Sequence, residues 1–126
     1  MQMLFDESEE FGRHKGLGLI SGKVNRFPAG MAEGGERLKV PHMGWNTIQI
    51  KQAAPIFKGT AQDSYVYFVH SYYCAADNPA DVAASCRYGD VEFSAAVWRD
   101  NLMATQFHPE KSQDVGLNIF KNFGEL

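Results

Sequence analysis

The sequence has little of several features that mark particular classes of protein. Only two cysteines, Cys74 and Cys86, occur among 126 residues, and they fit neither a metal-binding spacing nor a disulfide framework. No apolar run approaches the roughly 20 residues of a membrane span. Twelve basic residues against fifteen acidic ones give a net charge of −3, which does not indicate a nucleic-acid partner. Internal repeats and phosphate-binding glycine loops are also missing.

What is present has the composition of one small globular domain. Hydrophobic residues make up 44% and charged residues 21% of the chain, and a chain of this length buries about two-thirds of its surface. The acidic start, from Asp6 to Glu10, lacks the pattern of a signal peptide. We therefore expect a cytoplasmic protein with reduced, partly buried thiols.

In the first half of the chain, periodicity and turn residues predict a helix end, a strand and a loop. Met3-Leu4-Phe5 and the acids after it are typical of the end of a helix closed by Gly12. Pro41 and Gly44 indicate an irregular loop over residues 41–46. That loop presents Met43 and Trp45, either as anchors of an interface or as core residues.

The second half of the chain predicts a buried strand, an antiparallel meander and a helix. Tyr65 to His70 is a nearly continuous apolar run, typical of a central strand buried on both faces. Polar side chains at its end, from His70 to Tyr73, are expected to face a site. Strands are expected at residues 16–27, 47–50, 65–70, 82–88, 91–98 and 102–107. After a Ser112 cap, a helix is expected with an apolar stripe of Val115, Ile119, Phe120 and Phe123.

The segment Gln106-Phe107-His108-Pro109-Glu110-Lys111-Ser112 sets an imidazole and a carboxylate two residues apart at the end of a predicted strand. Such residues share a face, so Glu110 can accept the proton of one ring nitrogen of His108. The other nitrogen is then a base of the kind that activates a Ser or Cys nucleophile. The alternative is a partly exposed histidine and a surface carboxylate beside a turn. Neither cysteine has a basic partner in the sequence, so neither is predicted to be the nucleophile.

Three segments together resemble the class I glutamine amidotransferases. They are Val40-Pro41-His42-Met43-Gly44-Trp45-Asn46, Tyr67-Phe68-Val69-His70-Ser71-Tyr72 and the histidine segment just described. The first of them is similar to the glutaminase subunits of imidazole glycerol phosphate synthases, which serve histidine biosynthesis. The resemblance implies an α/β fold, the C-terminal part of the class I glutamine amidotransferase fold. It has a mixed sheet, an antiparallel meander and a C-terminal helix, in a single incomplete domain over residues 1–126.

The resemblance also implies roles for individual residues. In that family a cysteine on a nucleophile elbow attacks the amide of glutamine, a histidine relays protons, and ammonia travels to a cyclase subunit with a (β/α)8 barrel. His108 would be the base and Glu110 its orienter. The substrate glutamine would be contacted by Gln2, Ser71 and Tyr72. The cyclase side would hold Met43, Trp45, Asn46, Tyr67 and Lys111. No metal and no other cofactor are implied.

The chain departs from the family at its start. The elbow motif runs Gly-x-Cys-x-Gly-Met-Gln, and Met1-Gln2 resembles its last two residues, so we expect the nucleophile, the oxyanion-hole loop and the first strands to be missing. Loss of one triad member can lower turnover about 10⁶-fold, so the isolated chain is expected to be inactive. Three alternatives stay open: an incomplete reading of a full-length gene, one half of a split enzyme, or a non-catalytic docking module. An exposed sheet edge and apolar face would favour self-association.

Overall fold

Two four-stranded sheets carry most of the fold in the computed structural model, which describes residues 1–126. One has the order β2-β1-β3-β9, the other β12-β11-β10-β7. Their strands are β1 (Phe5–Ser8), β2 (His14–Lys15), β3 (Ile20–Arg26), β9 (Tyr72–Ala76), β7 (Gln49–Ile50), β10 (Val82–Tyr88), β11 (Val91–Arg99) and β12 (Leu102–Thr105). Strands β1 and β3 are parallel and the other pairs antiparallel. The predicted mixed sheet and the antiparallel meander are therefore confirmed.

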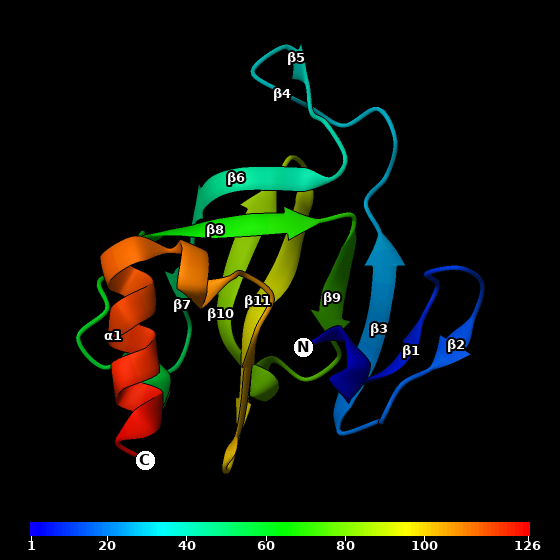
Figure 1. Ribbon diagram of the computed structural model, residues 1–126. Coiled ribbons are helices and arrows are strands. Elements are labelled where there is room, and N and C mark those ends of the chain that lie inside the picture. Colours follow the sequence, from blue (N-terminus) through cyan, green and yellow to red (C-terminus); the bar gives the residue numbers. More distant parts are fainter.

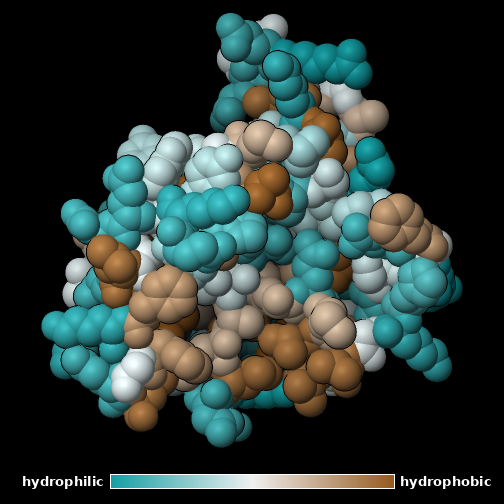
Figure 2. Space-filling model, viewed as in Figure 1, coloured by the Kyte–Doolittle hydropathy of each residue, from teal (hydrophilic) through white to brown (hydrophobic).

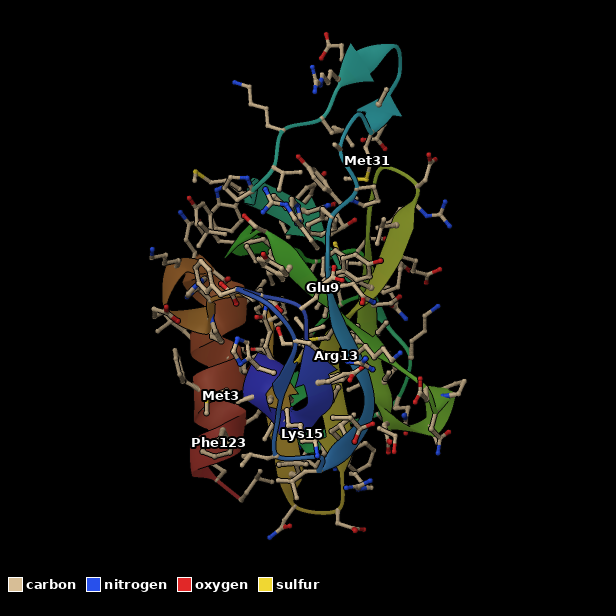
Figure 3. All side chains as sticks on the ribbon, turned by 90° about the vertical axis from the view of Figure 1, so that its right-hand side faces the viewer. Met3, Glu9, Arg13, Lys15, Met31 and Phe123 are labelled. Atoms are coloured by element: carbon tan, nitrogen blue, oxygen red, sulfur yellow. The ribbon has the colours of Figure 1, made fainter.

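Two short strand pairs and the helices complete the chain. Strand β6 (His42–Thr47) pairs with β8 (Tyr65–His70), and β4 (Ala32–Glu33) with β5 (Glu36–Arg37). In Figure 1, β6 and β8 cross above the meander and the β4–β5 hairpin projects beyond them. Figure 3 shows Met31 at the base of that hairpin. The 3-10 turns are η1 (Gln2–Leu4), η2 (Pro55–Phe57), η3 (Pro79–Asp81) and η4 (Pro109–Lys111). No helix is long and apolar enough to cross a membrane.

The core consists of two apolar clusters. The larger contains Phe68, Phe93 and Ile119, and so joins β8, the meander and the C-terminal helix. The smaller contains Phe5 and Val24, beneath β1 and β3. Phe107, the residue before His108, is buried in the larger cluster, so packing fixes the start of the His108 segment.

Helix α1 (Gln113–Gly124) confirms the predicted C-terminal helix, and of its predicted apolar stripe Ile119 lies in the larger cluster and Val115 packs against it. Phe120 and Phe123 are 50% and 58% exposed, so assigning them to the buried face was wrong. The buried face is lined by Gly116, Ile119 and Asn122. The Asn122 amide donates to two carbonyl oxygens next to η2, at 2.9 and 2.8 Å. A polar side chain can therefore take a core position because its donors are satisfied.

Ser112 occupies the N-cap position of α1, but its hydroxyl makes no cap hydrogen bond. It donates to the His108 carbonyl at 2.7 Å and accepts the Tyr67 N–H at 3.0 Å. Ser112 thus joins β8 to the segment that carries the candidate base.

Three sequence predictions about the first part of the fold were wrong. The chain opens on a 3-10 turn and β1, because Phe5 pairs with Ile20 of β3 rather than ending a helix. Residues 41–46 do not form a loop, since β6 begins directly after Pro41 and tolerates Gly44 at φ +123°. Strand β8 is not buried on both faces, because its exposure alternates residue by residue.

Candidate functional site

The imidazole of His108 and the carboxylate of Glu110, which the sequence predicts to pair, are hydrogen-bonded in the structure. His108 Nδ1 lies 2.7 Å from Glu110 Oε1. The contact is made at turn η4, because β12 ends at Thr105. The predicted contact is therefore confirmed, but its placement at the end of a strand was wrong. Hydrogen bonds, first from its own backbone N–H and then from His108, hold the pKa of the Glu110 carboxyl below its usual range. A charged Glu110 favours the proton on Nδ1 and leaves Nε2 of His108 as the basic nitrogen.

An open cavity of about 660 Å³ adjoins this histidine. It is lined by Gln2, Ser71, Tyr72, Gln106 and His108, among others. The Gln2 amide donates to the Tyr72 carbonyl and to Gln106 Oε1, each at 3.1 Å. The structure therefore brings the three predicted substrate contacts and the candidate base to one cavity, although they are far apart in the sequence.

Three of the predicted partner residues meet on the outer face of the β6–β8 pair. The rings of Trp45 and Tyr67 lie edge to face with centroids 5.9 Å apart. The Lys111 ammonium lies 5.7 Å from the centre of the Tyr67 ring. Met43 and Trp45 are 62% and 47% exposed, so they do not fill the core. We call Met43, Trp45, Tyr67 and Lys111 the aromatic face.

Asn46 is placed differently from the aromatic face. Its amide donates to the Arg87 carbonyl at 2.9 Å and lies 3.3 Å from His42 Nε2. Its carbonyl oxygen accepts the Thr47 N–H at 2.8 Å. The side chain therefore points to the inner side of β6, and direct contact with a partner stays a prediction for this residue.

Sequence reasoning missed a buried histidine pair on the inner side of β6 and β8. His42 and His70 are opposite each other in the antiparallel register, with His42 Nδ1 3.0 Å from His70 Nε2. Burial lowers the pKa of His42 to about 3 and that of His70 to about 4. Both rings are therefore neutral at pH 7. This pair could have been predicted only by assigning residues 41–46 to a strand, because pairing of that strand with β8 sets His42 opposite His70.

Neither cysteine is available as a nucleophile within residues 1–126. Cys74 and Cys86 are free and buried, and burial raises the pKa of each thiol to about 12. The Cys74 thiol faces Gln106 Oε1 at 3.8 Å rather than an imidazole. A thiolate for the cavity therefore does not come from these two residues. No group of three or more His, Cys, Asp or Glu side chains is arranged to hold a metal ion.

Comparison with known proteins agrees with this geometry. Residues 1–125 match the glutamine amidotransferase class-I family. The chain is 62% identical to "Imidazole glycerol phosphate synthase subunit HisH" of Syntrophotalea carbinolica over all 126 residues, and 60% identical to the protein of the same description in Geobacter sulfurreducens. It spans 61% and 60% of those two relatives.

A solved structure shares the fold. This chain resembles the crystal structure of a Thermoplasma acidophilum protein described as a putative GMP synthase component, with a TM-score of 0.59 at 24% identity. The match covers 81% of this chain and 46% of that one. The family match over nearly every residue, together with this fold, shows that the chain belongs to the class I glutamine amidotransferases.

Proposed function

We propose that the chain supplies the base half of a glutaminase site, which hydrolyses glutamine to glutamate and ammonia. The 2.7 Å contact between His108 and Glu110 at the edge of the cavity carries the proposal. Nε2 of His108 takes the proton of a cysteine thiol and later gives a proton to the departing ammonia. Glu110 accepts a hydrogen bond from the Nδ1–H of His108, which leaves Nε2 as the nitrogen that can accept a proton.

The substrate is held by Gln2, Ser71 and Tyr72 in this proposal. Their placement around one cavity lined by polar groups suits the two polar ends of glutamine. The nucleophile is provided by residues other than Cys74 and Cys86, because both thiols are buried and protonated. The chain alone is therefore expected to be inactive.

The partner is a cyclase subunit with a (β/α)8 barrel, which uses the ammonia to make imidazole glycerol phosphate in histidine biosynthesis. Similarity to the HisH subunits supports this partner. The aromatic face supports it too, since exposed tryptophan, tyrosine and methionine are enriched at protein interfaces. Asn46 is included as a partner contact on the family resemblance alone.

The proposal is tested by measuring glutamate release from glutamine with the chain alone and with a separately made polypeptide. That polypeptide is the part of the S. carbinolica relative that this chain does not match. We expect no turnover by either piece and turnover by the mixture. In the mixture, His108→Ala should lower kcat about 10⁶-fold, and Glu110→Gln about 10⁴-fold through loss of tautomer control.

A matched control is Glu125→Gln, which removes an exposed carboxylate at the far end of α1. It should leave kcat unchanged. Full activity of the His108→Ala mixture would refute the proposed role of the base.

The second candidate is a module that docks or self-associates without catalysis. Figure 2 shows apolar side chains gathered along the lower half of the face that it draws. The exposed large apolar residues include Met3, Leu17, Leu19, Leu117, Phe120 and Phe123. Such a surface favours association with a second copy. Light scattering at micromolar concentration distinguishes the cases, because a mass equal to one chain would count against self-association.

A further inference from the structure

The buried histidine pair belongs to a longer hydrogen-bonded row. In order, it contains Asn46, His42, His70, the Tyr72 carbonyl and the Gln2 amide. Successive heavy-atom distances are 3.3, 3.0, 2.8 and 3.1 Å. The row runs through the core beside β6 and β8 and ends at the cavity that His108 adjoins.

The direction of every hydrogen bond in the row is set at its carbonyl end. A carbonyl only accepts, so His70 Nδ1 must carry the proton that it shares with Tyr72. A neutral His70 then has Nε2 as an acceptor, and His42 Nδ1 must donate to it. Nε2 of His42 is left to accept from the Asn46 amide. Both rings therefore adopt the Nδ1–H tautomer.

Asn46 lies at the other end of the row, and its side-chain amide can adopt only one orientation there. Its amide nitrogen faces two acceptors, His42 Nε2 and the Arg87 carbonyl, and its oxygen faces the Thr47 N–H. Turning the amide over would set oxygen against the Arg87 carbonyl and nitrogen against a donor. Each member is thus satisfied in one arrangement only, which favours a rigid network.

We propose that His42 and His70 are positioning residues of the glutamine site, which fix the Tyr72 carbonyl and through it the Gln2 side chain. The inference rests on the proposed function for its ligand, but the hydrogen-bonded row itself does not. His42 is 3% exposed and does not line the cavity. His70 borders the cavity, but both of its ring nitrogens are already hydrogen-bonded, to His42 and to the Tyr72 carbonyl, so both histidines act through Tyr72 and Gln2. A pocket whose contacts are held in advance binds its ligand at lower cost.

Two substitutions of His42 separate hydrogen bonding from packing. The ring lies stacked on Tyr88 and Phe68, with centroids 4.0 and 4.8 Å away. His42→Phe keeps an aromatic ring between them but cannot donate to His70. His42→Asn has an amide nitrogen in the place of Nδ1 and can donate, but it loses the stacking. If His42 acts only by packing, His42→Phe should retain glutamine binding better than His42→Asn. If His42 acts by positioning through its hydrogen bond, His42→Asn should retain binding better.

The experiment is nitrogen-15 NMR of the 126-residue chain at pH 7, combined with titration of L-glutamine. We expect both imidazoles in the neutral Nδ1–H tautomer. His42→Phe should shift the Gln2 side-chain amide resonances and weaken glutamine binding about tenfold, as expected for one lost buried hydrogen bond. His42→Asn should restore both, although it unfolds at a lower temperature than His42→Phe.

Two results would overturn the inference. One is an Nε2–H or protonated imidazole at either position. The other is unchanged Gln2 resonances in His42→Phe. If the unaltered chain does not bind glutamine, the titration is repeated with the mixture of the two polypeptides, where absence of binding would refute the ligand of the proposed function. The tautomers and Gln2 resonances decide the positioning role in either case.

Discussion

A side chain at Gly116 would begin 1.7 Å from the carbonyl oxygen of Pro109. Helix α1 and turn η4 therefore touch backbone to backbone at this point, directly beside the His108–Glu110 pair. The missing side chain lets the helix support the turn.

Gly116→Ala should destabilise the protein although alanine favours helix. The gain in helix propensity is about 1 kcal/mol. The clash is with backbone and has no flexible neighbour to absorb it, so overpacking should outweigh that gain by about 2 kcal/mol or more. Urea denaturation followed by circular dichroism measures the change. Gly124→Ala, in the same helix with nothing within 4 Å of the added atom, is the matched control and should be neutral or stabilising.

Stability should fall as the pH drops from about 6.5 toward 4. In the folded chain the pKa of His42 is about 3 and that of His70 about 4, against about 6.5 when unfolded. Between these values the unfolded chain binds more protons, so acid favours unfolding. Each histidine contributes a slope of at most about 1.4 kcal/mol per pH unit. Urea midpoints at pH 7, 6 and 5 measure it.

The slope is assigned to the buried pair by removing one of its imidazoles. His42→Phe should reduce the slope between pH 7 and 5. A stability that is flat over this range in the unaltered chain would contradict the burial of the pair as neutral rings.

Both thiols should resist alkylation in the folded protein. Burial and a pKa raised to about 12 leave Cys74 and Cys86 almost without thiolate at pH 8. We expect slow reaction with iodoacetamide in buffer and two modifications in urea, counted by mass spectrometry. Rapid modification of the folded chain would show an accessible thiol and reopen the question of a nucleophile within these residues.

Trp45→Ala should weaken cyclase binding without unfolding the chain. The indole is 47% exposed and contacts Tyr67 on the outer face, so its removal costs little core packing. A central aromatic anchor typically contributes about 2 kcal/mol or more to an interface, which corresponds to a Kd raised about 30-fold. Calorimetric titration with the cyclase measures it. Phe120→Ala, which removes another exposed ring from α1, should leave the Kd unchanged.

Local patterns in the sequence were sufficient to predict the antiparallel meander and the contact between His108 and Glu110. The meander from Val82 to Thr105 has short turns between strands that are neighbours in sequence, and local pairing sufficed to predict it. His108 and Glu110 are two residues apart, so any tight backbone brings them together. The Gln2 contact with Tyr72 spans 70 residues, and only the family resemblance placed both at one site.

The remaining errors have a common physical cause. Phe5 belongs to a strand only because β3, fifteen residues on, lies beside it. Strand β6 contains a glycine at positive φ and follows a proline, both of which normally interrupt strands, and its pairing with β8 overrides them. Phe120 and Phe123 follow helical spacing, but the narrow contact at Gly116 turns the other side of α1 inward.

Because β6 pairs with β8, this part of the chain should tolerate substitutions better than insertions or deletions. Alternate residues of the two strands serve opposite sides, with His42 and His70 inward and Trp45 and Tyr67 outward. An insertion or deletion of one residue within 43–46 would turn the β6 side chains on one side of the change to the opposite face, since side chains alternate along a strand. The aromatic face and the buried row would then be disrupted together. Library selections should therefore recover many substitutions in this segment but no single-residue insertions or deletions.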